Sequence, residues 1–446
     1  MTKICFRADA SAQTGYGHFF RSLALAEMLS ERFECVFFLY EPTPAQIREC
    51  TGRFELQSLA DPFEDFLGRL SGDEFVVLDN YYFTGEYRKR IKDKGCALAC
   101  IDDFSATLSS ADLTINHGFN AMGPDWAILR KPFREAVPAK GRDGVCICFG
   151  GSDSLSLADS LSSVLGDCGK KVTVLHGSGR SAEQMADIFR SSEVCILSAS
   201  SVCYEALSCG CRVAAGWYVD NQKDFYNGLV DNGMVYPLGN LAASLPDREQ
   251  LLEALDKAPS GKWRKDIDVQ GNYIGLFQAV LARRDYRIDG LDFVNYVNLS
   301  REEKAAVLRC RNEESVRKWM CSTDEIPLEG HLAHIEGLRT RNDAFYWAVY
   351  LDGRLCGGVS LTGLKDSSAD EGIFLDPALA GRGLGTRISA ASFKLYFDIL
   401  GLKSIYSLVN QDNVAALKMD RRLGFSISEP RDGFVRIDLE AGHQLL

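Results

Sequence analysis

Short apolar segments rich in β-branched residues alternate with helical patterns from residue 3 to about residue 280, and this alternation restricts the chain to a small set of folds. The segments fall into two runs. The first run is KICFRA, CVFFLY, FVVLDN, ALACID and LTIN, and the second is VCICFG, KVTVLHG, VCILSA, RVAAGWY and MVYPLG. Strands that alternate with helices form parallel sheets with crossover helices. The pattern therefore predicts an α/β fold with two doubly wound, Rossmann-like halves.

Two breaks divide the chain into three predicted domains. A proline-containing stretch without a clear period separates the two runs and indicates a hinge near residues 130–143. A second break at residues 282–292 is charged and lacks apolar periodicity, and beyond it helical patterns precede strands. We therefore predict domains at residues 1–138, 139–282 and 283–446, which agrees with one domain per roughly 150 residues.

Charge and composition exclude several classes of protein. The 446 residues contain 50 Lys and Arg against 61 Asp and Glu, and the net charge of −11 argues against a general nucleic-acid binder. No apolar run approaches the roughly 20 residues of a membrane span, and the first residues enter a strand without a secretory leader. We therefore expect a cytoplasmic protein with no membrane partner. The 15 cysteines lack zinc or redox spacing, and no ligand-type cluster of Asp, Glu and His is apparent, so we expect reduced cysteines and no metal.

A glycine-containing loop after the first predicted strand holds the first candidate site. Gly15-Tyr16-Gly17-His18 precedes a helical pattern, and ligands of doubly wound sheets bind beyond the carboxyl ends of the strands. A histidine at this position can deprotonate a water molecule. The alternative is a buried histidine that caps the helix or satisfies the loop backbone. The glycine spacing does not fit a dinucleotide-binding fingerprint.

The motifs R-x-D-A-S at residues 7–11 and G-x-G-H-x-x-R at residues 15–21 resemble the start of the UDP-sugar hydrolases of pseudaminic acid biosynthesis. These enzymes act on UDP-2,4-diacetamido-2,4,6-trideoxy-β-L-altropyranose. The resemblance covers about 280 residues and continues through Asp79-Asn80-Tyr81, Ile101-Asp102-Asp103, Asn116, Leu129-Arg130 with Phe133, and Phe149-Gly150-Gly151-Ser152-Asp153. It implies a GT-B fold, with the substrate between two Rossmann-like halves. It also implies that His18 is the general base, which activates water against the anomeric carbon and releases UDP and the free sugar with inversion.

Both halves supply predicted substrate contacts. In the first half we assign Gly17, Arg21, Asp79 and Tyr81 to substrate or water positioning. The second half supplies residues at three junctions between a strand and a helix: Gly150, Gly151 and Ser152; Ser200, Ser201 and Glu205; Asn221 and Gln222. Backbone amides at such junctions can face a diphosphate. Similarity to GT-B enzymes that bind UDP implies that Glu205 holds the ribose hydroxyls; the alternative is a solvated carboxylate favoured by the helix dipole.

A second glycine-rich loop lies in the third predicted domain. Residues 369–375 are typical of a strand, which leads into a loop with closely spaced glycines and then a helix. Such a loop forms a nest of amides that suits a pyrophosphate. Together with a later strand, Asn413 and Leu423-Gly424-Phe425, it resembles the GNAT acetyltransferases. The resemblance implies that acetyl-CoA is bound by Leu375, Gly381, Arg382, Gly383, Leu384, Gly385, Thr386 and Asn413.

Two positions depart from the GNAT pattern. The glutamine or arginine that usually begins the loop is Ala380, which leaves the amides intact. The tyrosine that often serves as general acid, seven residues after the asparagine, is Asp420, so the sequence assigns no general acid. Glu371, on the strand beside the expected thioester, is predicted to draw a proton from the acceptor amine through a water molecule. The alternative for Glu371 is a surface carboxylate that pairs across the strands.

The upstream part of this domain carries a narrower resemblance. Its segments are Leu308-Arg309, Asn312-Glu313, Val316-Arg317-Lys318-Trp319-Met320, Ile326-Pro327, His331 and Phe345-Tyr346-Trp347-Ala348-Val349. They resemble the acetyltransferase of the same pathway, which acetylates the 4-amino group of a UDP-4-amino-4,6-dideoxy-N-acetyl-altrosamine. We expect Trp319 and Met320 to form an acceptor pocket; the alternative is that these side chains fill the core. His331 and His334 lie three residues apart on one helix face, and without a third ligand we favour a structural or substrate contact over a metal.

The two resemblances belong to consecutive steps of one pathway, so the sequence predicts a bifunctional enzyme. The C-terminal domain would acetylate the UDP-amino sugar, and the N-terminal pair of domains would hydrolyse the product. The alternatives are a GT-B glycosyltransferase fused to an acetyltransferase, a binding protein that holds a nucleotide sugar without turnover, and an acetyltransferase domain that only senses acetyl-CoA. The expected partners are UDP-linked amino sugars, acetyl-CoA and a downstream synthase of the sialic acid type.

Overall fold

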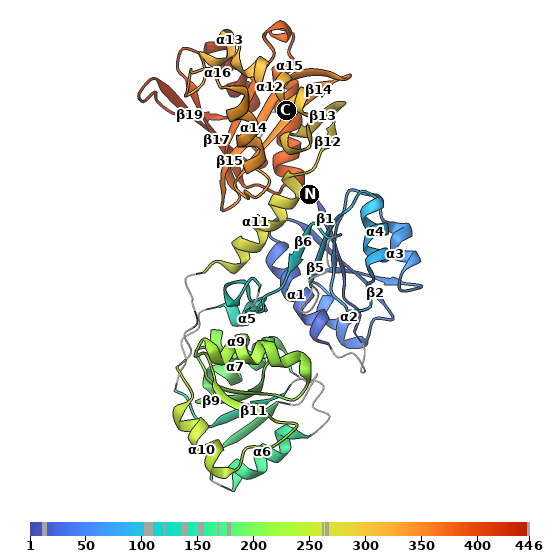
Figure 1. Ribbon diagram of the computed structural model, residues 1–446, viewed down its shortest axis with the longest axis vertical. Helices are drawn as coiled ribbons and strands as arrows, with labels where there is room; N and C mark the ends of the chain where they lie inside the picture. Colours follow the sequence, from blue (N-terminus) through green and yellow to red (C-terminus); the bar gives the residue numbers. More distant parts are fainter. Residues whose placement is uncertain are drawn as a thin grey trace. The chain divides into compact units, whose positions relative to one another are not determined.

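The computed structural model describes ten stretches of the chain: residues 1–10, 16–101, 110–119, 121–135, 141–149, 156–167, 169–175, 180–260, 263 and 267–443. Their contacts divide the chain into two compact units. One unit comprises Lys3–Glu31 and Cys35–Gln270, and the other comprises Met1–Thr2, Arg32–Glu34 and Gly271–Leu446. Three sheets occur within the described residues (Figure 1).

The first sheet has the strand order β3-β2-β1-β4-β5-β6. Its strands are β1 (Lys3–Arg7), β2 (Glu34–Tyr40), β3 (Glu55–Leu59), β4 (Phe75–Leu78), β5 (Ala97–Ile101) and β6 (Leu113–Ile115), and its helices are α1 (Gly17–Leu29), α2 (Pro44–Cys50), α3 (Glu64–Arg69) and α4 (Gly85–Asp93). The pairs β1/β4, β4/β5, β5/β6 and β2/β3 are parallel. All residues of β4 and β5 are buried, because a parallel sheet is covered on both faces.

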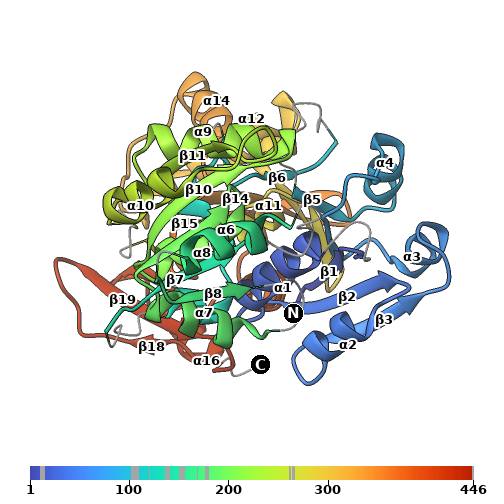
Figure 2. The ribbon, with the colours of Figure 1, turned by 90° about the horizontal axis from the view of Figure 1, so that it is seen from below.

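The second sheet has the order β11-β10-β9-β7-β8, and its strand pairs are parallel. Its strands are β7 (Val145–Cys148), β8 (Val172–Leu175), β9 (Val194–Ser198), β10 (Arg212–Trp217) and β11 (Tyr236–Asn240). Its helices are α6 (Leu157–Gly166), α7 (Ala182–Ser191), α8 (Ser201–Ser208), η3 (Asp220–Gln222), α9 (Lys223–Asp231) and α10 (Arg248–Lys257), and Figure 2 shows α6 and α8 beside these strands. Separate apolar clusters cover the two faces. The short helices η1 (Pro124–Trp126) and α5 (Lys131–Arg134) lie in the segment that joins the first two sheets. The two parallel sheets confirm the predicted Rossmann-like α/β halves.

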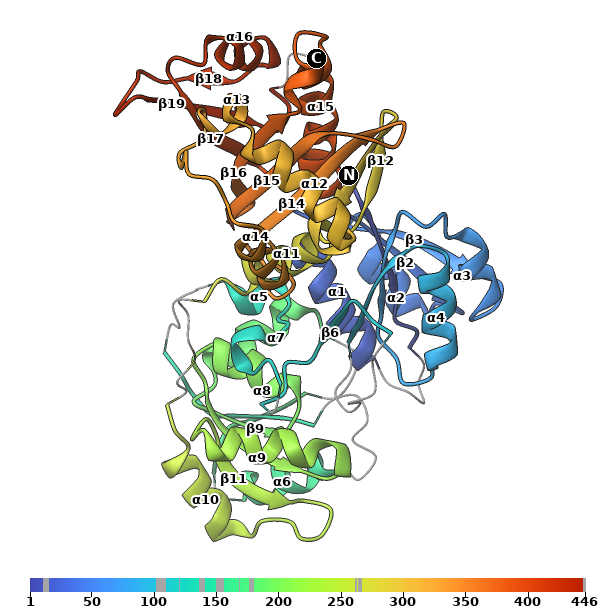
Figure 3. The ribbon, with the colours of Figure 1, turned by 45° about the horizontal axis from the view of Figure 1, so that its top comes forward.

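The third sheet is mixed, with the order β12-β13-β14-β15-β16-β17-β19-β18. Its strands are β12 (Tyr286–Ile288), β13 (Leu291–Asn295), β14 (Ala344–Leu351), β15 (Arg354–Lys365), β16 (Ser368–Leu375), β17 (Ser404–Asn410), β18 (Ser426–Ile427) and β19 (Phe434–Glu440). Its helices are α11 (Val269–Ala282), η4 (Tyr296–Asn298), α12 (Arg301–Asn312), α13 (Glu314–Arg317), α14 (Leu328–Gly337), η5 (Pro377–Leu379), α15 (Leu384–Phe393), the π-helical turn η6 (Lys394–Ile399) and α16 (Val414–Leu423). Figure 3 shows α12 and α14 over strands β14 and β15. An apolar cluster joins these helices to the sheet.

Strands β16 and β17 form a parallel pair over only three residues each. The last pair is Asp370 with Tyr406, and beyond it residues 371–375 and 407–410 have no mutual pairing. Beyond Asp370 the two strands are therefore not paired with each other. The other strand pairs of this sheet are antiparallel, which distinguishes it from the two preceding sheets.

The unit that contains this sheet includes two pieces from the start of the chain. The Thr2 hydroxyl donates a hydrogen bond to the Ile399 carbonyl (2.8 Å). Gly401 has φ +67°, and a Cβ atom there would lie 2.7 Å from the Arg32 carbonyl oxygen, so a glycine is required at this close approach. The unit also takes in most of α11, from Gly271 onward. No helix among the described residues is long and apolar enough to cross a membrane.

Candidate active sites

A buried carboxylate joins two side chains of α1 at the carboxyl edge of the first sheet. Asp79 directly follows β4, and its backbone N–H donates to the carbonyl of Arg7 on the neighbouring strand β1 (2.9 Å). His18 and Arg21 lie on the first turns of α1, the helix that follows β1. Because adjacent parallel strands end at the same edge, the three side chains meet there.

The Asp79 carboxylate is fully occupied by its neighbours. His18 Nδ1 lies 2.8 Å from Asp79 Oδ1, and Arg21 contributes two bonds, from Nη2 to Oδ1 (2.7 Å) and from Nε to Oδ2 (3.0 Å). The Ser22 hydroxyl adds a bond to Oδ2 (3.2 Å). Burial alone would raise the pKa of the Asp79 carboxyl, but the charge of Arg21 and the hydrogen bonds from His18 and Arg21 hold this pKa below its ordinary value.

This arrangement defines which nitrogen of His18 is free to react. An ionised carboxylate only accepts hydrogen bonds, so His18 Nδ1 donates to Asp79. In the neutral ring, Nε2 then carries the lone pair and can accept a proton. The ring of Tyr81 lies edge-on to His18 with 4.7 Å between centroids, and 57% of Tyr81 is exposed. The arrangement therefore offers a positioned base beside an exposed aromatic ring.

The structure joins His18 and Arg21 to Asp79 and places Tyr81 beside His18, but Asp79 differs from the predicted substrate contact. Asp79 is completely buried, so it cannot reach a substrate and instead orients His18 and Arg21. Gly17 is exposed at the start of α1, and no atom lies within 4 Å of a Cβ placed there.

A second buried pair, absent from the sequence assignments, shapes the neighbouring loops. Arg7 is fully buried and forms an ion pair with Asp9 (2.9 Å). Asp9 also accepts hydrogen bonds from the backbone N–H of Tyr40 (2.7 Å) and from the Tyr82 hydroxyl. The sequence motif R-x-D at residues 7–9 could have indicated this ion pair, which has a structural role.

The predicted residues of the second half gather at the carboxyl edge of the second sheet. Ser200 and Ser201 follow β9, and Asn221 and Gln222 follow the adjacent strand β10. Ser201 and Asn221 are exposed, whereas the Gln222 side chain accepts a hydrogen bond from the backbone N–H of Tyr218 (3.1 Å). The predicted residues Gly150, Gly151 and Ser152 lie outside the described residues.

Glu205 has a partner that the sequence did not indicate. Arg130 forms a two-pronged ion pair with it, from Nε to Oε1 (2.8 Å) and from Nη2 to Oε2 (2.9 Å). Each side chain is only 12% exposed. The guanidinium of Arg130 also lies over the rings of Phe20 and Phe133, at 5.5 and 4.9 Å. Glu205 is therefore not a solvated carboxylate. Both of its carboxylate oxygens accept hydrogen bonds from Arg130.

The glycine-rich loop of the third sheet is open to solvent. Gly381 and Gly383 have φ +77° and +75°, and no atom lies within 4 Å of a Cβ at either position. Gly383 caps the N-terminus of α15, whose first amides lack helical partners. Of the other predicted cofactor residues, Arg382 and Thr386 are exposed, and Leu375, Leu384 and Gly385 are half-buried. This arrangement suits a pyrophosphate at the helix N-terminus.

Asn413 caps α16 rather than pointing freely from it. Its side-chain oxygen accepts a hydrogen bond from the backbone N–H of Ala416 (3.2 Å), which satisfies one of the first amides of the helix. The amide nitrogen of the Asn413 side chain remains the group that can donate to a cofactor arm.

Glu371 and Asp420 are both buried, with exposed fractions of 5% and 6%. Burial, followed by the charges of Asp420 and Asp370, raises the pKa of Glu371 to about 8. Burial raises the pKa of Asp420 to about 7. The interpretation of Glu371 as a surface carboxylate is therefore wrong.

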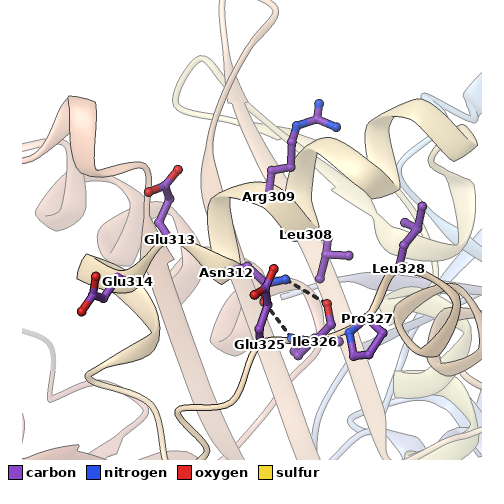
Figure 4. A pocket seen from close by; sticks show the side chains of 9 residues that line it. All are labelled: Leu308, Arg309, Asn312, Glu313, Glu314, Glu325, Ile326, Pro327 and Leu328. Atoms are coloured by element: carbon purple, nitrogen blue, oxygen red, sulfur yellow. Dashed lines mark hydrogen bonds between the residues drawn. The ribbon is translucent and has the colours of Figure 1, made fainter.

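A cavity of about 650 Å³ lies on the α12–α14 side of the same unit (Figure 4). It is lined by Leu308, Arg309, Asn312, Glu313, Glu314, Glu325, Ile326, Pro327 and Leu328. The Asn312 side chain bonds both backbone groups of Ile326 (2.8 and 3.1 Å) and so fixes the loop that forms one wall. Trp319 and Met320, the predicted acceptor residues, are half-buried in the turn between these walls and do not line the cavity.

The histidines of α14 contact aromatic side chains. The His331 ring faces Tyr296 at 6.1 Å, and the His334 ring faces Tyr346 at 5.3 Å. Within the described stretches, no group of three or more His, Cys, Asp or Glu side chains could hold a metal ion.

Comparison with known families and proteins separates the chain into two similarities. Residues 295–426 match the family model described as an acetyltransferase (GNAT) domain. The chain is also 26% identical over 149 residues to acetyltransferase PseH of Campylobacter jejuni, which covers 33% of this chain and 93% of PseH. A crystal structure of C. jejuni PseH with acetyl coenzyme A matches 34% of this chain and 99% of that chain, at 20% identity and a TM-score of 0.29. The family match confirms the predicted GNAT domain, and GNAT enzymes use acetyl-CoA.

The second similarity is to a UDP-2,4-diacetamido-2,4,6-trideoxy-beta-L-altropyranose hydrolase of C. jejuni. The identity is 26% over 275 residues, which covers 52% of this chain and 97% of the hydrolase. The chain thus joins a region similar to a nucleotide-sugar hydrolase to a region similar to an N-acetyltransferase, as the sequence motifs predicted.

Proposed function

We propose that this chain is a bifunctional enzyme of pseudaminic acid biosynthesis. Its C-terminal domain transfers an acetyl group from acetyl-CoA to the 4-amino group of a UDP-4-amino-4,6-dideoxy-N-acetyl-altrosamine. Its N-terminal domains hydrolyse the product, UDP-2,4-diacetamido-2,4,6-trideoxy-β-L-altropyranose, to the free sugar and UDP. The similarity of one chain to enzymes with both names supports the proposal. The proposed domain boundaries are 1–138, 139–282 and 283–446, with the first two domains in a GT-B arrangement.

The observation that carries the hydrolase proposal is the contact between His18 and Asp79. In the proposed mechanism, His18 Nε2 accepts a proton from a water molecule while the water oxygen attacks the anomeric carbon. The bond from that carbon to the diphosphate breaks, and UDP leaves with the bonding electrons. Asp79 stabilises the imidazolium that forms, because its ionised carboxylate lies 2.8 Å from Nδ1. The exposed ring of Tyr81 provides a surface for the sugar.

The UDP portion is proposed to bind at the carboxyl edge of the second sheet. Ser200, Ser201, Asn221 and Gln222 contribute there; the predicted contacts of residues 150–152 lie outside the described residues. Backbone amides can stabilise the leaving diphosphate without a general acid, since they are aimed at developing negative charge. Glu205 keeps lone pairs available for ribose hydroxyls while both of its oxygens accept bonds from Arg130.

The acetyltransferase proposal rests on the open loop before α15. Its amides would hold the pyrophosphate of acetyl-CoA, and the pantetheine arm would extend along the unpaired ends of β16 and β17. We propose the cavity beside α12 as part of the acceptor site. Its three glutamates attract an ammonium group, and Arg309 supplies a charge for a phosphate.

The test is mass spectrometry of the full chain with UDP-4-amino-4,6-dideoxy-N-acetyl-β-L-altrosamine, with and without acetyl-CoA. We expect the diacetamido sugar nucleotide to form only with acetyl-CoA and to be followed by free sugar and UDP. Accumulation of intact acetylated UDP-sugar would contradict the hydrolase. Absence of acetylation would contradict the transferase. Release of free sugar without any added glycosyl acceptor distinguishes the hydrolase from a glycosyltransferase.

A further inference from the structure

A buried ion pair joins the segment just before α5 to helix α8, within one compact unit. Arg130 donates from Nε to Glu205 Oε1 (2.8 Å) and from Nη2 to Glu205 Oε2 (2.9 Å). Each side chain is only 12% exposed. A two-pronged contact of this kind fixes the orientation of a carboxylate as well as balancing its charge. Glu205 belongs to the proposed UDP site, so the partner that fixes it bears on how that site recognises its ligand.

The Arg130 guanidinium is itself held in place by its neighbours. It lies over the ring of Phe20 at 5.5 Å and over the ring of Phe133 at 4.9 Å. Its Nη2 also lies 3.5 Å from the Met185 sulfur. Aromatic faces attract a guanidinium and restrict the plane that it can adopt. Arg130 therefore presents its two donors to Glu205 from a fixed position.

The charges of the pair leave Glu205 able to accept further hydrogen bonds. Burial lowers the pKa of the Arg130 guanidinium, but the charge of Glu205 and the hydrogen bonds between the two groups outweigh this effect and raise the pKa above its ordinary value. An ionised carboxylate has about four lone-pair positions. Arg130 occupies one position on each oxygen, so the remaining positions can accept hydrogen bonds from two hydroxyl groups.

The place of Glu205 on α8 suits a ribose. Ser201 is the first residue of this helix and is exposed, and Glu205 lies four residues later on the same face. One helical turn advances about 5.4 Å along the helix axis. A diphosphate at the N-terminus of α8 would bring the directly attached ribose to the level of Glu205.

We propose that Arg130 is a positioning residue for ribose recognition, which orients the Glu205 carboxylate so that its remaining lone pairs accept the 2′- and 3′-hydroxyl groups of UDP. The inference rests on the proposed UDP site and deepens it, because it assigns the selectivity for a ribonucleotide to a residue beyond the predicted contacts. Without Arg130, the Glu205 carboxylate would lose the two bonds that orient it, and an unpaired charge at this buried position is costly.

The experiment measures the Kd of UDP and of 2′-deoxy-UDP by calorimetry with the full chain. The variants are Arg130→Gln, Arg130→Lys, Glu205→Gln and the double variant of Arg130→Gln with Glu205→Gln. Circular dichroism establishes that each variant is folded. The quantity compared is the ratio of the two Kd values, because a general loosening of the fold weakens both ligands alike and leaves this ratio unchanged.

Arg190→Gln is the matched control. The Arg190 side chain is also 12% exposed, and it donates to the backbone carbonyls of Pro132 and Glu135. Its loss therefore loosens the segment that follows Arg130 and leaves the contact with Glu205 in place.

The unaltered chain should bind UDP about tenfold or more tightly than 2′-deoxy-UDP, because the deoxy ligand lacks a hydrogen bond to a charged group. Arg130→Gln should reduce this ratio to about threefold or less. Arg130→Lys should give an intermediate ratio, because a lysine keeps the charge but cannot hold both carboxylate oxygens in a fork. The double variant should have the ratio of Glu205→Gln alone, because Arg130 acts on the ribose through Glu205. Arg190→Gln should keep the full ratio.

The proposal would be overturned by a folded Arg130→Gln chain with the full ratio, or by a double variant whose ratio falls below that of Glu205→Gln. Both results leave the proposed UDP site in place. If Arg130→Gln did not fold, the full ratio in Arg130→Lys would equally overturn the proposal. A full ratio in Glu205→Gln would instead remove the proposed ribose contact of Glu205, and the role of Arg130 with it. Failure of the unaltered chain to bind UDP would remove the proposed function itself.

Discussion

At the scale of single residues, the Asp79 carboxylate determines what His18 can do. It accepts hydrogen bonds from three side chains while it is completely buried. Its ionised form selects the tautomer of His18 with a free Nε2, and the bonds from Arg21 keep the carboxylate itself in place. The reactive nitrogen is thus positioned by a residue that no substrate can contact.

Asp79→Asn should lower kcat for UDP-sugar hydrolysis by roughly 10³-fold, because an amide can hold the imidazole in the wrong tautomer. The Kd for UDP should change little, since Asp79 does not reach the ligand. Asp73→Asn, an exposed carboxylate just before the same strand, is the control and should keep full activity. Rates and UDP affinity measured on the same preparations would refute the positioning role if UDP binding, rather than kcat, were lost.

The raised pKa of Glu371 makes the free energy of unfolding depend on pH. Its pKa of about 8 in the folded chain exceeds its ordinary value of 4.5, so the folded state holds the proton more tightly than the unfolded state. The free energy of unfolding should therefore fall as pH rises from 4.5 to 8, by up to about 1.4 kcal/mol per pH unit, and level off above that range.

Glu371→Gln should weaken this decline, which urea denaturation of the full chain at pH 6 and pH 8.5 can measure. The relevant quantity is the difference between the variant and the unaltered chain at each pH. Asp398→Asn, which alters an exposed carboxylate, should reproduce the unaltered chain at both pH values. An identical pH dependence in Glu371→Gln and the unaltered chain would mean that Glu371 is ionised in the folded protein.

At the scale of elements, periodicity and local motifs predicted much of the structure, and long-range contacts were beyond their reach. Alternating apolar runs identify the strands of both parallel sheets, because such strands are buried on both faces. The glycine loop before α15 is visible because its residues are adjacent in sequence. The Arg130–Glu205 pair joins residues 75 positions apart, and nothing local to either residue indicates the partner. The burial of Glu371 and Asp420 depends on how α16 packs, which a spacing rule does not report.

The turn that ends the π-helical segment η6 shows the same limit. Gly401 has φ +67° and approaches the Arg32 carbonyl, a contact between residues far apart in sequence. Gly401→Ala should therefore suffer two penalties: the positive φ, which costs about 1 kcal/mol, and a clash with backbone that cannot easily move.

Gly353 is the matched control, because it has φ +75° but no atom within 4 Å of a Cβ position. Gly353→Ala should lose about 1 kcal/mol and Gly401→Ala about 2 kcal/mol or more. Chemical denaturation of both variants in the full chain provides the comparison. Equal losses would mean that residues 32–34 yield without cost and are not a firm part of this unit.

At the scale of the whole molecule, the two proposed activities occupy separate units. His18 and Asp79 belong to the unit formed by Lys3–Glu31 and Cys35–Gln270, whereas the glycine loop before α15 and Glu371 belong to the other unit. No side chain is shared between the two proposed sites. The order of the reactions is therefore determined by chemistry: acetylation creates the substrate that hydrolysis consumes.

Because the two sites are separate, a variant in one unit should block hydrolysis and a variant in the other should block acetylation. His18→Ala should acetylate the UDP-amino sugar at the unaltered rate and accumulate the diacetamido sugar nucleotide, because nothing in the acetyltransferase unit depends on His18. Glu371→Gln, which removes the predicted base, should acetylate slowly but hydrolyse preformed diacetamido sugar nucleotide at the unaltered rate. Mixing the two variants should restore the full sequence from amino sugar to free sugar, since each supplies the step that the other lacks. Mass spectrometry over time would detect both blocks and the restoration. If the mixture failed although each variant performed its own step on supplied substrate, the intermediate would have to pass within one chain, and the two units could not be treated as independent catalysts.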